Sequence, residues 1–180
     1  SLQPNVWTEA QDDVFMKYEF PVEGPKLEDF TLCYRFQRTL LPAYETHFSY
    51  ALPNIDNALE FAVEANDGTY GMVMIYNGGY PYGRQFYQPP LGLYTWYHFC
   101  HVISSSYLLF LDGKLVFSAN WIKGRIPLNM TGTLIIGQEQ DAVGSGFSVD
   151  EIMRGYVSEF NIWNKVLERD QISKFANQSQ

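Results

Sequence analysis

Oxygen-bearing side chains gather at two places in the sequence, and their types suit a hard cation. Asp56-Asn57 follows an apolar stretch that ends at Ala51, and Glu139-Gln140-Asp141 directly follows Leu134-Ile135-Ile136. Calcium takes about six to eight oxygen ligands from carboxylates, side-chain amides and backbone carbonyls. Because the chain carries a net charge of −8, acidic surface loops are also expected without a metal. The pattern alone therefore leaves both interpretations open.

The same acidic run permits an enzymatic interpretation. Glu139 and Asp141 are two residues apart, so on a strand both would face the same way. Retaining glycosidases need two carboxyl groups about 5–5.5 Å apart, and some of them carry a third acid two residues further along. That position is Val143 here. Because the catalytic set is incomplete, a hydrolase is the weaker alternative and we predict no enzyme.

Nitrogen and sulfur donors occur together at His98, Cys100 and His101. On a strand His98 and Cys100 face one way and His101 the other, so the three cannot meet at one ion without a bulge. The run Ser104-Ser105-Ser106 has no neighbouring acid to complete a nucleophilic triad. We interpret the first three as ordinary strand positions and the serines as a polar loop.

The pattern of apolar residues predicts short strands along most of the chain, and these strands must position the residues described above. Alternation with a period of two, or a short apolar run, predicts strands at 14–20, 30–37, 58–63, 72–76, 108–111, 115–117, 134–136 and 156–163. Asp112-Gly113 predicts a tight hairpin, and only 168–176 has helical spacing. Many short strands and one late helix predict an all-β sandwich, with 1–180 as a single domain.

The composition limits the classes of function. Aromatic residues make up 17% of the chain and charged residues 18%, a mixture that favours strands. No apolar run approaches the roughly 18 residues of a membrane helix, so the chain is not expected to span a membrane. A charge of −8 argues against nucleic acid, whose phosphates need a basic surface. The sequons at Asn129 and Asn177 are candidate glycosylation sites and are compatible with secretion.

Four separated stretches resemble the pentraxin family, the group of C-reactive protein and serum amyloid P component. They are Phe30-Thr31-Leu32-Cys33, Phe48-Ser49-Tyr50-Ala51 with Asp56-Asn57, His98-Phe99-Cys100, and Ile135-Ile136-Gly137-Gln138-Glu139-Gln140-Asp141 with Trp163 and Leu167. They stand in the family's order with family-like spacing. The resemblance implies a two-sheet jelly-roll sandwich with a short C-terminal helix, calcium-dependent ligand binding and cyclic oligomers.

The resemblance also implies roles for single residues. The implied calcium ligands are Asp56, Asn57, Glu139, Gln140 (through its backbone carbonyl) and Asp141. Glu151 stands where the family usually has glutamine, and Ser148 stands where it has a bridging glutamate. A neutral serine cannot offset the repulsion between two adjacent divalent ions. We therefore predict one firmly held calcium ion and a weak or empty second site reached by Glu151.

The two cysteines are expected to form a disulfide between neighbouring strands, with Cys33 on the face of its strand opposite Phe30 and Phe36. Other positions depart from the family pattern. Val102 and Ile103 replace a hydroxyl residue and a tryptophan, and Ala62 takes the place of an aromatic residue that recognises choline. The chain also stops before a final strand segment that members usually have. The resemblance is thus to a divergent pentraxin for which phosphocholine is not the expected ligand.

These observations predict a secreted or extracellular, non-catalytic module that binds phosphate- or carboxylate-bearing ligands through calcium. The ion lets a chain of charge −8 attract an anion. The alternative is an adhesion or receptor ectodomain module that binds protein with reduced or lost calcium dependence. Residues 76–97 are rich in aromatics and contain Arg84 as their only charge, which suits either core packing or a contact surface. Avidity for repeated ligands favours a cyclic homo-oligomer.

Overall fold

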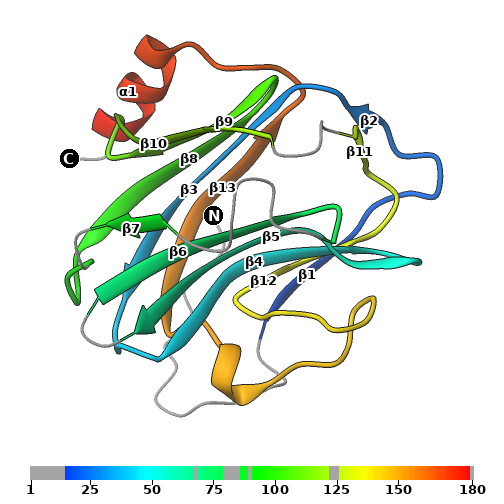
Figure 1. Cartoon of the computed structure of the whole chain (residues 1–180), viewed down its shortest axis with the longest axis horizontal. Coiled ribbons are helices and arrows are strands. Elements are labelled where there is room, and N and C mark those ends of the chain that lie inside the picture. The colour runs from blue at the N-terminus through cyan, green and yellow to red at the C-terminus, as the bar shows by residue number, and fades with distance from the viewer. Residues whose placement is uncertain (1–14, 67–68, 79–85, 89–90, 122–125, 179–180) are drawn as a thin grey trace.

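The computed structural model describes residues 15–66, 69–78, 86–88, 91–121 and 126–178, and these form two antiparallel sheets stacked face to face (Figure 1). The first sheet has the strand order β1-β12-β4-β5-β6-β7, the second β10-β9-β8-β3-β13, and β11 pairs with β2. The strands are β1 (Met16–Glu19), β2 (Lys26–Leu27), β3 (Phe30–Arg38), β4 (Tyr44–Leu52), β5 (Ile55–Asn66), β6 (Thr69–Tyr76), β7 (Phe86–Gln88), β8 (Trp96–Ile103), β9 (Ser106–Leu111), β10 (Lys114–Asn120), β11 (Leu128–Asn129), β12 (Thr133–Ile136) and β13 (Gly155–Trp163). The architecture confirms the predicted β-sandwich.

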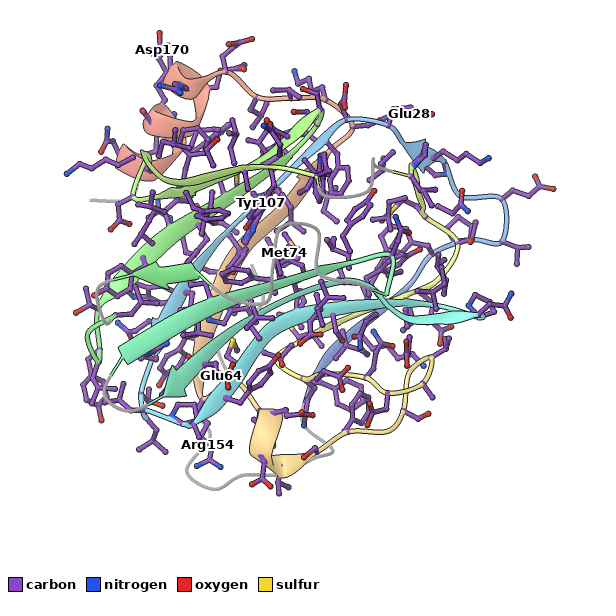
Figure 2. The ribbon with its side chains drawn as sticks, viewed as in Figure 1. Glu28, Glu64, Met74, Tyr107, Arg154 and Asp170 are labelled. Carbon is purple, nitrogen blue, oxygen red and sulfur yellow. A yellow bond between two sulfur atoms is a disulfide. The ribbon has the colours of Figure 1, made fainter. Side chains whose placement is uncertain are left out.

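The main core lies between the two sheets. Alternation along β3 places Phe30 and Phe36 in this space, where both are fully buried. Met74 from β6 and Tyr107 from β9, which are labelled in Figure 2, enter the same core from opposite sheets. Burial of large apolar side chains from both layers stabilises the stacking, at about 1.5–3 kcal/mol for each side chain.

A short chain of polar groups crosses this core. The hydroxyl of Tyr34 and Nδ1 of His47 are 2.8 Å apart, and Nδ1 of His101 lies 2.9 Å from the hydroxyl of Tyr107. All four side chains are buried. Burial lowers the pKa of both histidines, which favours their neutral forms inside an otherwise apolar interior.

The helix predicted near the C-terminus is α1 (Arg169–Asn177), which covers the outer face of the second sheet (Figure 1). It rests on the β9–β10 hairpin, whose turn residues Asp112 and Gly113 have φ of 48° and 74°, as a type I′ turn requires. The hydroxyl of Ser173 donates to the Gly113 carbonyl at 3.2 Å. The predicted hairpin is confirmed. No helix in the described part of the chain is long and apolar enough to cross a membrane.

The predicted disulfide joins Cys33 to Cys100, which are direct cross-strand partners on β3 and β8. As expected, it lies outside the main core. It is not at the surface, however, because Cys33 and Cys100 are 2% and 0% exposed in a second apolar cluster with Leu167 and Ile172. The helix therefore shields the disulfide from solvent.

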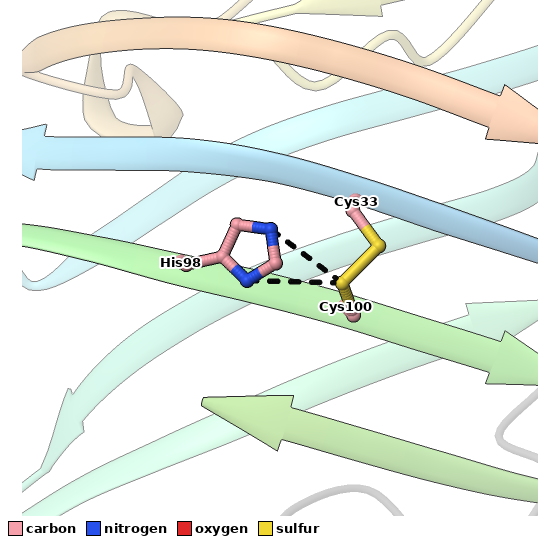
Figure 3. A group of neighbouring side chains, drawn as sticks. All are labelled: Cys33, His98 and Cys100. Atoms are coloured by element: carbon pink, nitrogen blue, oxygen red, sulfur yellow. Dashed lines mark hydrogen bonds between the residues drawn. A yellow bond between two sulfur atoms is a disulfide. The ribbon is translucent and has the colours of Figure 1, made fainter. Parts of the chain in front are cut away.

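The histidines near this disulfide face opposite ways. His98 lies on the α1 side, with Nε2 3.7 Å from Cys100 Sγ (Figure 3), whereas His101 points into the main core. Burial and the nearby Arg35 charge lower the pKa of His98 to about 4. The opposite facing of His98 and His101 is what the strand-parity argument predicted, and both sulfurs beside His98 are used in the disulfide.

Candidate calcium site

Two loops at one end of the first sheet carry the residues that the resemblance singled out. Asp56 and Asn57 begin β5 just after the tight turn from β4, and Glu139 to Asp141 lie in the loop after β12. A pocket of about 310 Å³ lies between the loops, and both Asp56 and Asp141 line it. The structure therefore brings the two separated acidic segments together.

Gln140 holds the second loop in place with its side chain. Its amide nitrogen donates to the Ser49 carbonyl at 3.0 Å and to the Thr133 carbonyl at 3.1 Å, and its Oε1 accepts from the Gly144 amide at 2.9 Å. The side chain is fully buried. Because both ends of the amide hold the loop, the side chain is a structural tie, and the atom of Gln140 that would contribute to an ion is its backbone carbonyl.

Asn57 connects the two loops. In the amide orientation that satisfies the hydrogen bonds, Nδ2 of Asn57 donates to Glu139 Oε1 at 3.0 Å and to Glu60 Oε2 at 3.2 Å. One amide nitrogen thus touches carboxylates from both β5 and the loop after β12. This contact fixes the relative position of the two acidic segments.

Glu60 is the site residue that the sequence analysis missed. It lies on β5, is 1% exposed, and accepts a hydrogen bond from the Tyr44 hydroxyl at 3.1 Å. A lone acid between Ala58 and Ala62 in an alternating strand gives the sequence pattern of a solvent-facing position. No signal in the sequence distinguishes this buried acid from a solvent-facing one.

Glu151 approaches from a third segment. The short 3-10 helix η1 (Val149–Glu151) begins where the Ser148 hydroxyl accepts from the Asp150 amide, and the next residue, Ile152, bridges to Thr46 of β4. Partial burial, followed by the nearby charges of Asp141 and Asp150, raises the pKa of Glu151. Ser148, which the resemblance matches with the family's bridging glutamate, therefore caps η1 in this structure.

The carboxylates at this site disfavour one another's charged forms. Burial, followed by the charges of Glu60, Asp141 and Glu151, raises the pKa of Glu139 to about 8. Burial, with smaller contributions from Glu151 and Asp141, raises the pKa of Glu60 to about 7. A divalent cation placed among these groups would remove that cost. The donors are all oxygens, which suits calcium rather than a metal that prefers nitrogen or sulfur.

The effect of calcium on thermal stability should increase with pH. Between an ordinary glutamate pKa of about 4.5 and the raised values, the folded protein holds protons that the unfolded chain has released, so the stability of the calcium-free protein falls as pH rises. A bound calcium ion would offset this loss. We expect the calcium-induced rise in Tm to grow between about pH 5 and about pH 8. The buried histidines affect both forms alike, so their contribution cancels; a rise in Tm that is constant with pH would contradict the prediction.

The arrangement does not reproduce the glycosidase geometry that alternation suggested. Glu139 and Asp141 lie in an irregular loop after β12 rather than on a strand, so strand alternation does not place them on one face. Glu139 is 5% exposed, whereas Asp141 is exposed.

The stacked sheets and the loops at their end define a lectin-like jelly-roll protein. A model described as the pentaxin family matches residues 5–180. The chain belongs to the pentraxin family. The solved structure of a native heptameric SAP-like pentraxin from Limulus polyphemus is similar, with a TM-score of 0.77 and 26% identity, covering 94% of this chain and 79% of that one.

Two relatives show how this chain compares in length. C-reactive protein 1.4 of Limulus polyphemus is 32% identical over 163 residues, which cover 87% of this chain and 66% of that protein. Neuronal pentraxin-2 of Cavia porcellus is 32% identical over 158 residues, 85% of this chain and 35% of that protein. The chain therefore spans just under two thirds of the first relative and about one third of the second.

Proposed function

We propose that this chain is an extracellular, non-catalytic recognition module that binds anionic ligands through calcium. Asp56, Asn57, Glu139, Asp141 and the backbone carbonyl of Gln140 would hold the ion, and a phosphate or carboxylate of the ligand would supply further oxygens. The ion supplies the positive charge that the acidic chain lacks. The protein's own residues hold the loops together and form the pocket.

The observation that carries this proposal is the convergence of acidic groups from β5 and from the loop after β12. Glu139 shares the Asn57 amide with Glu60, while Asp56 and Asp141 face one pocket. Repulsion among buried carboxylates is costly unless the groups are protonated or a cation is bound. Family membership supports the same conclusion, because the chain is related to C-reactive proteins.

Calorimetry with calcium, before and after chelation, tests the proposal directly. We expect calcium to bind the protein after a chelator has removed its metal. The calcium-loaded protein should be retained on a phosphoethanolamine or acidic-sugar resin and released by chelator. Ala62 is fully buried and pairs with Val73, so no aromatic ring stands at that position to receive a choline group. Retention that survives chelation would contradict calcium-bridged binding.

The number of ions provides a separate prediction. One calcium ion should bind firmly and a second weakly, because Ser148 offers a neutral hydroxyl that already caps η1. Ser148→Glu should add or tighten the second site, since a carboxylate offsets the repulsion between two ions. Calorimetric stoichiometry measures both. Two tight equivalents in the unmodified protein would show that Glu151 and its neighbours already complete the second site.

A second candidate function is protein binding without calcium. Tyr94 is 68% exposed and Trp96 44% exposed, and the Trp96 ring lies 6.3 Å from that of Tyr156. Large exposed aromatic groups often mark contact surfaces, including the contacts of a cyclic oligomer. Tyr80 and Tyr82 lie outside the described residues. A molecular mass of 20.8 kDa by light scattering, the mass of a single chain, in concentrated solution would contradict the prediction of a cyclic oligomer.

A further inference from the structure

Glu60 is engaged at both carboxylate oxygens. Oε1 accepts from the Tyr44 hydroxyl at 3.1 Å, and Oε2 lies 3.2 Å from the Asn57 amide nitrogen. The residue is 1% exposed. A buried acid with both oxygens occupied is well placed to orient a neighbour, and poorly placed to meet a ligand from solvent.

The neighbour that Glu60 touches is a proposed calcium ligand. A side-chain amide donates through its nitrogen and accepts through its oxygen. Fixing the Asn57 nitrogen therefore fixes the oxygen that would bind the ion. The same nitrogen also donates to Glu139 at 3.0 Å, but Glu139 is itself a proposed ligand whose carboxylate would be drawn to the ion. Glu60 is the acceptor that stays available to Asn57 when calcium is bound.

We propose that Glu60 is a positioning residue of the calcium site, held by Tyr44 and acting through the amide of Asn57. The inference rests on the proposed calcium-binding function. Groups that orient metal ligands typically change metal affinity by about 10- to 100-fold when they are removed. Glu60 thereby extends the site inward from the loops to the paired strands β4 and β5, from which Tyr44 and Glu60 come.

Glu60→Leu should weaken calcium binding by about tenfold, measured by calorimetry. The substitution removes both hydrogen bonds and fills the buried space with an apolar group. Without calcium, the variant should melt at or above the temperature of the unmodified protein, because a buried acid beside other acids has been removed. Weaker calcium binding together with an undiminished calcium-free Tm separates positioning from general damage to the fold.

Two conservative variants separate orientation from charge. Glu60→Gln keeps an oxygen that can accept from Asn57, so its calcium affinity should stay close to that of the unmodified protein. Glu64→Gln removes a charge from the same strand, at the residue labelled in Figure 2, and should leave the affinity unchanged. Equal losses of calcium affinity in Glu60→Gln and Glu60→Leu would overturn the proposal, because the loss of charge alone would then explain the weaker binding.

A double-mutant cycle with Asn57→Ala tests the route through the amide. If Glu60 acts through Asn57, Glu60→Leu causes no further loss once Asn57 is alanine; a full tenfold loss in that background contradicts the inference. Tyr44→Phe, which leaves both partners in place, should weaken binding in the same direction by less, and it decides the matter if Glu60→Leu does not fold. An unmodified protein that binds no calcium would instead refute the proposed function itself.

Discussion

Asp141→Asn is expected to abolish most of the calcium binding, lowering the affinity by about 100-fold or more. Asp141 lies in the pocket that Asp56 also lines, and burial, with a smaller contribution from the Asp141 charge, raises the pKa values of Glu60, Glu139 and Glu151. The substitution keeps the side chain's size but removes a full negative charge and one strong oxygen ligand. Calorimetry over a wide calcium range measures the loss.

Asp150→Asn is the matched control, since it removes the same charge from an exposed position nine residues further along the chain. Exposed charges interact weakly in water, so the control should change calcium affinity by no more than about threefold. Comparable affinities for Asp141→Asn and the unmodified protein would refute the proposed role of Asp141. If Asp150→Asn lowers the calcium affinity as much as Asp141→Asn does, the ion lies closer to η1 than we propose.

Removal of the disulfide should lower the free energy of unfolding by about 4 kcal/mol. Cys33 and Cys100 are 67 residues apart in sequence, so the link removes many conformations from the unfolded chain. The double substitution Cys33→Ala with Cys100→Ala tests this by urea unfolding. Both side chains also belong to the apolar cluster under α1, so lost packing adds to the effect.

A reducing agent provides the control for this variant. Unfolding of the unmodified protein should move toward that of the double-alanine variant under reducing conditions, whereas the variant itself should not respond. Two titratable thiols in the folded, unreduced protein would disprove the disulfide.

The strands with simple patterns were predictable from sequence. The expected strand at 30–37 is β3 (Phe30–Arg38), and the Asp112-Gly113 hairpin is present because those two residues adopt positive φ. The expected strand at 58–63 is much longer, extending as β5 from Ile55 to Asn66. Its ends pair through the backbone, Ile55 with Leu52 of β4 at one end and Glu64 with Tyr44 of β4 and Gly71 of β6 at the other. Backbone pairing leaves no periodic signal in the side chains, so these ends could not be predicted.

The site was predictable only in part. Resemblance identified the residues of the two loops, and the structure places those loops against one pocket. Glu60 was not found, because a single acid on an alternating strand carries no sign of burial. The outer face of β3 looked polar, yet Cys33 is covered there by α1. In both cases the missing information is which distant segment covers a strand face.

The bonds made by Gln140 have a consequence for discrimination between ions. Magnesium requires a small, nearly octahedral set of oxygens at about 2.0–2.1 Å, whereas calcium accepts a wider and less regular one. A loop tied to Ser49, Thr133 and Gly144 through one buried side chain cannot easily contract around the smaller ion. Its rigidity disfavours magnesium, so the buried side-chain amide of Gln140 would act as a size filter even though only the backbone carbonyl of that residue is a proposed ligand.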